Sequence, residues 1–429
     1  MDAADIAFLV ICSAMVMLMT PGLAFFYGGM VRVKSALNML MMCFIALGIC
    51  SVLWVLYGFS LAFGSDFADG GGGLIGNLEF IGFRGVTEAD SGLLAFALFQ
   101  MMFAVLTPAL ISGALADRVR FGTWALFVAL WVTIVYFPVA HWVWGGDGWI
   151  GALEWDGREV IDFAGGTAVH INAGIGALAA VLVIGKRIGF KREPMRPHNL
   201  PMVLLGAALL WFGWFGFNAG SELAANGTTA MMALNTMAAT GAAVLGWLLY
   251  ERIRHGAATT LGAASGAIAG LVAITPSGAN VNPMGALLIG VLAGVICAWA
   301  VSLKYKWGFD DSLDVVGVHL VGGLFGTLAV GFLATEGAGY QLFALQSFAA
   351  GAVMVYSFVV TWLIAKLLQS TIGFRSTEEE EVGGLDQVYH AETGYDFSQG
   401  GSGSVSVGTQ TPDAATAAGD TTGDKKVDA

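Results

Sequence analysis

The stretch Asp162-Phe-Ala-Gly-Gly-Thr-Ala-Val-His170-Ile-Asn172 decides the fold, together with Asp314-Val-Val-Gly-Val-His319 in the second half of the chain. No charged side chain lies within four residues of either histidine, and long apolar runs surround both. An ionisable residue in hydrocarbon is costly, so it marks a functional site by default. For either histidine alone, a hydrogen bond between two helices is the alternative. Two histidines in equivalent places favour a shared polar station in an apolar pore.

The composition around these stretches is that of an integral membrane protein. Hydrophobic residues fill 57% of the 429 positions and charged residues 12%, whereas soluble proteins carry about 25% charged residues. A helix that crosses a bilayer needs ~20 consecutive, mostly apolar residues. The sequence therefore predicts an all-α membrane protein with eleven transmembrane helices, at 6–30, 36–63, 92–115, 121–144, 163–185, 199–220, 228–250, 259–275, 283–303, 315–334 and 342–368.

The distribution of basic residues predicts the orientation of these helices. If the loops alternate between two sides, one side receives every lysine and arginine except Arg84 and Arg158. Lysine and arginine in short loops mark the cytoplasm. The prediction is a multi-pass protein of the plasma membrane with the N-terminus outside and the C-terminus cytoplasmic. The outer loops are acidic, which fits either the attraction of cations or ordinary solubility.

The helices divide into an inverted repeat of five plus five, with one extra helix at the end. Inverted repeats place a transport site near the bilayer midplane, at their interface. His170 belongs to the fifth segment and His319 to the tenth, and each has an aspartate upstream, Asp162 and Asp314. Glycines spaced four residues apart allow close helix packing, and they are Gly262, Gly266 and Gly270, Gly290 and Gly294, and Gly322 and Gly326.

The sequence predicts three regions and no cofactor. Residues 1–369 form the transmembrane transport domain and 370–397 a cytoplasmic regulatory tail, and 398–429 are acidic, low in complexity and predicted to be disordered. The four cysteines lie in spanning segments without metal-site spacing, and small apolar packing residues are the favoured interpretation. The glycine-rich runs are not in the strand-turn-helix context of a nucleotide site, and the sequence has no hydrolase motif. We therefore expect neither an enzyme nor a nucleic-acid partner.

Five stretches resemble the ammonium transporter family, which includes the Rhesus glycoproteins. The resemblance runs over about residues 6–395, and its motifs are PGLAFFYGGMVR (21–32), AHWVWG (140–145), DFAGGTAVHIN (162–172), GWFGFNAGS (213–221) and DVVGVH (314–319). In this order, five motifs are a specific match. The resemblance implies a transporter of ammonium or ammonia, with methylammonium as a further substrate, assembled as a homotrimer in the lipid bilayer.

The resemblance implies an outer recruitment site made by Trp144 and Ser221, above a stacked gate of Phe103 and Phe217. Taken alone, Trp144 would be an interface anchor and both phenylalanines would be core residues. Trp is the best aromatic face for a cation that loses its water. A serine hydroxyl can accept a hydrogen bond from ammonium. Trp214 is expected to line the same vestibule.

Tyr27 is expected to line that vestibule together with Trp214.

Below the gate, His170 and His319 are expected to face one another across the pore, either as a passive track for NH3 or as a proton relay. Asp162 lies eight residues before His170, about 12 Å along a regular helix. It is therefore interpreted as structural, near the recruitment site. Many relatives carry an aromatic residue where this chain has Val316, so the pore there is expected to be wider.

These inferences predict an ammonium transporter that recruits NH4+, removes its proton and conducts NH3. The alternatives are an electroneutral Rhesus-type channel for NH3 or CO2, and an ammonium sensor that carries little flux. The tail GLDQVYHAETGY (384–395) resembles the regulatory segment of the family, with Tyr389 and Ala391 in place of the usual Glu and Gly. The resemblance implies that cytosolic P-II signalling proteins are partners which close the pore mouth.

Overall fold

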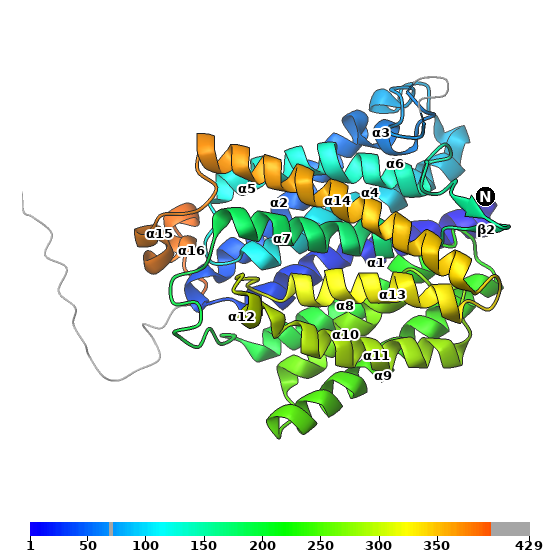
Figure 1. Cartoon of the computed structure of the whole chain (residues 1–429). Helices are drawn as coiled ribbons and strands as arrows, with labels where there is room; N and C mark the ends of the chain where they lie inside the picture. Colours follow the sequence, from blue (N-terminus) through cyan, green and yellow to red (C-terminus); the bar gives the residue numbers. More distant parts are fainter. Residues whose placement is uncertain (68–71, 396–429) are drawn as a thin grey trace, which may run out of the picture. The chain divides into compact units, whose positions relative to one another are not determined.

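The computed structural model describes residues 1–67 and 72–395, and residues Met1–Gly394 form one compact unit made mostly of helices (Figure 1). The predicted disordered tail, 398–429, lies outside the described residues, as do the basic residues Lys425 and Lys426. Two short strands, β1 (Glu154–Trp155) and β2 (Arg158–Glu159), pair as an antiparallel hairpin. A short 3-10 turn, η3 (Ile81–Phe83), lies in the loop before the third span.

Within the described residues, ten helical stretches are long and apolar enough to cross a bilayer. They are α1 (Ala3–Met30); η1 (Val33–Ser35) with α2 (Ala36–Leu53), η2 (Trp54–Gly58) and α3 (Phe59–Phe63); η4 (Glu88–Asp90) with α4 (Ser91–Leu115); α5 (Phe121–Trp131) with η5 (Val132–Tyr136) and α6 (Phe137–Trp144); η6 (Gly166–Ile171) with α7 (Asn172–Ile184); α8 (Leu200–Gly220); α9 (Gly227–His255); α11 (Pro283–Ala300) with α12 (Leu303–Trp307); η7 (Val316–Leu320) with α13 (Val321–Leu333); and α14 (Tyr340–Thr371).

The structure confirms the predicted class, a helical membrane protein, and places a helix at each predicted segment. The predicted segment 259–275 is the shorter apolar helix α10 (Thr260–Ile274), of 15 residues. Because α10 is short for a spanning helix, the count of eleven stays a prediction. The N-out orientation and the inverted repeat also stay predictions.

Glycine allows neighbouring helices to approach closely, as the spacing pattern predicts. A β-carbon on Gly290 of α11 would overlap the carbonyl oxygen of Ala239 on α9, and one on Gly294 would overlap that of Ala243. On the pair α1 and α8, a β-carbon on Gly206 would collide with the backbone of Phe26. Such contacts between backbones replace the hydrophobic driving force that lipid cannot supply.

The basic loops meet on one face of the unit. Arg187 binds Asp310 through a 2.8 Å ion pair and Asp117 at 3.3 Å, and Arg118 donates to the carbonyl of Asp310. Burial alone would raise the pKa of the Asp310 carboxyl, but the guanidinium groups of Arg187 and Arg118 hold this pKa at about 2. Arg32 also pairs with Asp117, at 3.3 Å. These contacts support the prediction that these loops share one side of the membrane.

Two short helices, α15 (Glu378–Gly383) and α16 (Leu385–His390), pack against this face. Buried Glu381 of α15 binds Arg32 at 3.3 Å and Arg375 at 2.9 Å, and it accepts a hydrogen bond from the Ile188 N–H at 2.7 Å. Asp386 of α16 accepts hydrogen bonds from the first N–H groups of α2, at 2.7 and 3.1 Å. The predicted regulatory tail thus caps a spanning helix.

The close packing of α9 and α11 gives a direct test. Gly290→Ala places a methyl group against a carbonyl oxygen that cannot move away, so we expect a loss of about 1–3 kcal/mol in folding stability. Gly241→Ala on α9 is the matched control, because nothing lies within 4 Å of its β-carbon. Thermal unfolding in detergent measures both variants. Equal melting temperatures would show that this contact does not hold the helices together.

Candidate functional site

Five of the predicted site residues form a continuous column of rings. The rings of Trp144 and Phe103 meet edge to face with centroids 5.9 Å apart, and those of Phe103 and Phe217 lie 4.3 Å apart. Phe217 is followed by His170 at 5.9 Å, and His170 by His319 at 5.4 Å. The column joins α6, α4, α8, η6 and η7 in that order. It brings together residues from both halves of the chain, as the sequence predicts.

The two imidazoles make direct contact. Their Nδ1 atoms are 3.4 Å apart and the rings are tilted by 30°. Because both atoms are Nδ1, one ring must donate and the other accept, so at most one hydrogen lies between them. Both side chains are buried, and His170 Nε2 has no hydrogen-bond partner among the described residues. A neutral pair of this kind can offer a donor or an acceptor to a small polar molecule in the pore.

Asp162 binds the irregular backbone that precedes His170. Its carboxylate accepts hydrogen bonds from the N–H groups of Gly165 (3.0 Å), Thr167 (3.0 Å) and Ala168 (2.9 Å). Gly165 has a left-handed φ of 113°, which favours glycine. These donors would otherwise be unpaired at the start of a helix. Asp162 therefore caps the backbone at the start of η6, and its structural role near a recruitment site stays a prediction.

In the second half, Asp311 takes the place of Asp162, not the predicted Asp314. Asp311 accepts hydrogen bonds from the N–H groups of Val315 (3.0 Å) and Val316 (2.7 Å), at the start of η7. It lies eight residues before His319, the same spacing as Asp162 and His170. Asp314 instead binds Lys304 Nζ at 2.6 Å. The equal spacing was the signal that sequence reasoning missed.

Trp144 and Ser221 each contact one residue of the phenylalanine pair: Trp144 meets Phe103, and Ser221 follows Phe217 by one helical turn on α8. Trp144 Nε1 donates to the carbonyl of Asp162 at 2.9 Å, which fixes the ring beside the cap of η6. Ser221 Oγ donates to the carbonyl of Phe217 at 2.8 Å. Its proton is therefore used, and its lone pairs are available to accept from a cation. Both side chains are partly exposed.

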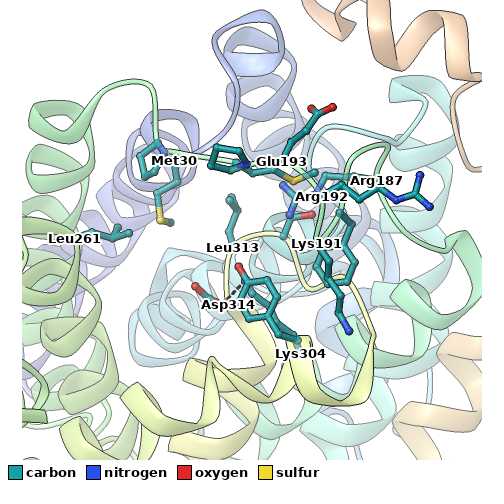
Figure 2. Close-up of a pocket in the computed structure, with 15 residues that line it drawn as sticks. Met30, Arg187, Lys191, Arg192, Glu193, Leu261, Lys304, Leu313 and Asp314 are labelled. Carbon is teal, nitrogen blue, oxygen red and sulfur yellow. Dashed lines mark hydrogen bonds and ion pairs between the residues drawn. The ribbon is translucent and has the colours of Figure 1, made fainter. Parts of the chain in front are cut away.

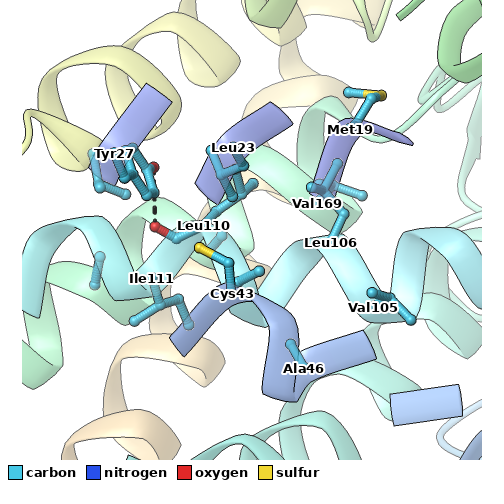
Figure 3. Close-up of a cluster of buried hydrophobic side chains, with 14 of the residues drawn as sticks. Met19, Leu23, Tyr27, Cys43, Ala46, Val105, Leu106, Leu110, Ile111 and Val169 are labelled. Atoms are coloured by element: carbon cyan, nitrogen blue, oxygen red, sulfur yellow. Dashed lines mark hydrogen bonds between the residues drawn. The ribbon is translucent and has the colours of Figure 1, made fainter. Parts of the chain in front are cut away.

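Trp214 and Tyr27 lie elsewhere than expected. Trp214 is beyond the gate, where its ring stacks on His170 at 5.4 Å and Nε1 donates to Thr275 Oγ1 at 2.9 Å. Tyr27 is buried near the opposite end of α1, where its hydroxyl donates to the carbonyl of Leu110 at 3.1 Å (Figure 3). The prediction of Tyr27 in the vestibule was wrong, because α1 starts on the side of Trp144 and ends on the other side.

On the face of the basic loops, the structure has a cavity of about 480 Å³ (Figure 2). Arg187, Lys191 and Arg192 lie together on one side of the cavity, and Leu313 and Asp314 also line it. Asp314 directly follows Leu313, five residues before His319 along the chain. This cavity is therefore the candidate inner mouth.

Comparison with known proteins agrees with this geometry. The model of the Ammonium Transporter Family matches residues 7–395. An ammonium transporter of Mycobacterium tuberculosis (strain ATCC 25618 / H37Rv) is 53% identical over 94% of this chain and 92% of its own length. One of Bacillus subtilis (strain 168) is 46% identical over 92% and 99%. The chain belongs to the ammonium transporter family. As in its relatives, the activity is transport across the membrane and not enzymatic.

Solved structures of this family share the fold. A sensor Amt protein superposes with a TM-score of 0.84 at 29% identity, covering 90% of this chain and 98% of its own. Mep2 of Candida albicans gives a TM-score of 0.81 at 32% identity, covering 89% and 88%. The membership makes this chain an ammonium transporter of the plasma membrane, with several membrane-spanning helices.

The left-handed backbone of Ala391, just after α16, gives a prediction about the tail of this transporter. Its φ is 55°, a conformation that favours glycine, and glycine is usual at this place in the family that the tail resembles. We expect Ala391→Gly to stabilise the docked tail by about 1 kcal/mol. Amide hydrogen exchange of α16 measures the effect. Gln387→Gly, inside α16, is the control and should weaken the protection of α16 from exchange. Protection that is unchanged in Ala391→Gly would contradict the prediction.

The cap formed by Asp162 predicts a large effect on stability. Asp162→Ala leaves three buried N–H groups without a partner, and each such group costs about 1–3 kcal/mol. We expect a strongly lowered melting temperature and little folded transporter. Glu336→Ala is the control, since Glu336 is exposed in the loop between α13 and α14 and is not among the residues with a left-handed backbone. A melting temperature for Asp162→Ala as high as that of the control would show that the cap is not needed.

Proposed function

We propose that this transporter recruits NH4+ at Trp144 and Ser221, removes its proton near the Phe103–Phe217 pair, and conducts NH3 past His170 and His319. The observation that supports the proposal is the unbroken column from Trp144 to His319. It offers aromatic faces at its outer end and imidazoles at its centre. Methylammonium, which carries the same ammonium group, is the expected second substrate.

The magnitudes favour deprotonation over passage of the ion. A bare monovalent cation in a low-dielectric medium costs tens of kcal/mol by Born estimates. With the lysine amine (pKa ~10.4) as an upper reference, removal of the proton at pH 7 costs under about 5 kcal/mol. Ammonium can therefore cross as NH3. K+ has no proton to lose and keeps the full cost, so the pore selects without a size filter.

The histidine pair then forms hydrogen bonds with NH3 in the pore. Burial disfavours a charged imidazole, and the pair presents donors and acceptors that replace the water NH3 leaves behind. His170 Nε2 is buried and without a partner among the described residues, so it is available for this purpose. A passive track and a proton relay are both compatible with rings 3.4 Å apart at Nδ1.

Removal of the imidazoles tests the proposal. Each hydrogen bond to NH3 is worth about 1 kcal/mol, so His170→Ala with His319→Ala should lower ammonium flux roughly tenfold or more. K+ should still not pass, because its desolvation cost is unchanged. Currents and uptake in proteoliposomes, with ammonium or K+ pulses, measure both. His255→Ala, exposed at the end of α9, is the control. A K+ current equal to the ammonium current would refute selection by a dry constriction.

The recruitment step predicts an effect on apparent affinity. A cation–π contact with Trp is worth up to ~2 kcal/mol, so Trp144→Leu should raise the half-saturating ammonium concentration by up to about thirty-fold. Trp144→Phe keeps an aromatic face but loses the hydrogen bond to Asp162, and it should recover part of the affinity. Uptake over a range of ammonium concentrations measures both. Equal half-saturating ammonium concentrations for Trp144→Leu and Trp144→Phe would assign the effect to the lost hydrogen bond.

Two alternatives make different predictions. A Rhesus-type gas channel would take up ammonia at the normal rate without any current after an ammonium pulse. An ammonium sensor would signal with little flux, and one similar solved structure is that of a sensor Amt protein. Deletion of 396–429 should leave uptake nearly intact in a transporter. A cut after residue 370 is less suitable, because it also removes Glu381 and Asp386 from their partners.

We also infer, from the family likeness, a homotrimer and a cytosolic P-II protein as partner. A P-II loop would enter the inner mouth beside Lys191 and Arg192 and close it. The docked helices α15 and α16 lie on the same face and support this position. Mass measurement of the purified protein in detergent tests the trimer. A P-II protein that fails to bind under every nucleotide condition would remove this partner.

A further inference from the structure

An apolar cavity away from the pore column is unexplained by ammonium transport. It has a volume of about 540 Å³ and lies between α7, the pair α11 and α12, and the η7–α13 span. Its walls include Leu178 and Leu182 of α7 and Val316 and Leu320 of η7, all apolar. In a bilayer such a space is filled by hydrocarbon, because water gains no partners there.

Two lysine ammonium groups converge on the rim of this cavity. Gly308, which ends α12, is part of the lining. The position of a β-carbon on Gly308 would lie 3.7 Å from Lys186 Nζ and 3.8 Å from Lys191 Nζ. Both side chains are exposed, and neither forms an ion pair with a carboxylate in the described part of the chain. Lys304, also in this region, is by contrast paired with Asp314 at 2.6 Å.

Two tryptophans mark the depth of the cavity in the membrane. Trp299 and Trp307 line it and are 51% and 67% exposed. Exposed tryptophan rings gather at the level of lipid headgroups. The lysines belong to the face of basic loops, which is the predicted cytoplasmic side. The cavity therefore has apolar walls at the depth of acyl chains and uncompensated positive charge at the depth of headgroups.

We propose that this cavity binds an anionic phospholipid of the inner leaflet. One acyl chain fills the space between α7, α11 and η7, and the phosphate lies between Lys186 and Lys191. A basic pocket between spanning helices on the cytoplasmic side suits such a headgroup. Soluble phosphate would use only the lysines, and a neutral lipid only the apolar walls. The combination of the two selects a lipid with a negative headgroup.

The bound chain would contact the segment that carries His319. Val316 and Leu320 are in η7, on either side of His319 along the chain. Packing against them restricts η7 from the lipid side, while the hydrogen bonds of Asp311 restrict its start. The site is independent of how ammonium crosses the pore, so its test does not depend on transport.

Native mass spectrometry of the full-length protein in detergent tests the site. Phosphatidylglycerol and phosphatidylcholine are added in turn, and the affinity of the first bound lipid is measured. Lys186→Gln with Lys191→Gln should weaken phosphatidylglycerol binding about thirty-fold and leave phosphatidylcholine unchanged. Lys366→Gln with Arg254→Gln removes the same charge from exposed positions outside the cavity and should change neither.

A second variant separates the acyl chain from the headgroup. Leu182→Trp fills part of the cavity and keeps both lysines, and it should also weaken phosphatidylglycerol binding. The melting temperature of each variant shows that it is folded. Equal loss in the control pair would assign binding to general surface charge and overturn the proposal. Competition by millimolar glycerol phosphate as strong as by the intact lipid would overturn it as well, since the acyl chain would then contribute nothing.

Discussion

Every backbone N–H and C=O inside hydrocarbon needs a partner, and this constraint shapes both halves of the pore. The two histidine-bearing spans begin with irregular backbone, and in each an aspartate supplies the missing acceptors. Asp162 serves Thr167 and Ala168, and Asp311 serves Val315 and Val316. Because both oxygens of each carboxylate accept hydrogen bonds from backbone N–H groups, each carboxylate is held in place. The π-helical turns η6 and η7 then carry their imidazoles toward one another.

The fold followed from sequence to a large extent, because the bilayer imposes a length and a polarity on each span. The ring column also followed, since its motifs match a known family. The choice of Asp314 as the counterpart of Asp162 was wrong, because nearness to His319 in the sequence was weighed above equal spacing. Tyr27 was misplaced because its motif was assigned to the vestibule without following α1 to its end. Side-chain contacts such as Trp214 on His170 depend on packing between distant helices, which one sequence does not encode locally.

Charged side chains are separated from the ring column and gather where the basic loops meet, on one face of the unit. The column from Trp144 to His319 has uncharged side chains only, whereas the loops below it hold Arg118, Arg187, Asp117 and Asp310 in contact. Burial lowers the pKa of Arg118 to about 10, which still leaves it charged near neutral pH. These pairs join the loop after α4 to the loops after α7 and before η7. They therefore tie the two histidine-bearing spans together on one side of the membrane.

The ion pairs between these loops limit the movements that a transport cycle can use. Breaking a buried ion pair by removing one partner costs about 3–5 kcal/mol, so a transport cycle that separated these loops would need to supply a comparable energy at each turn. The aromatic gate needs far less, because a pair of phenyl rings 4.3 Å apart is worth only about 0.5–1.5 kcal/mol beyond the area it buries. Separating the phenyl rings is thus far less costly than separating the ion-paired loops. Loops held by ion pairs beside a weakly held phenyl pair agree with the proposed selection by chemistry at the column, and they make a large alternation of the two halves the less favourable mechanism.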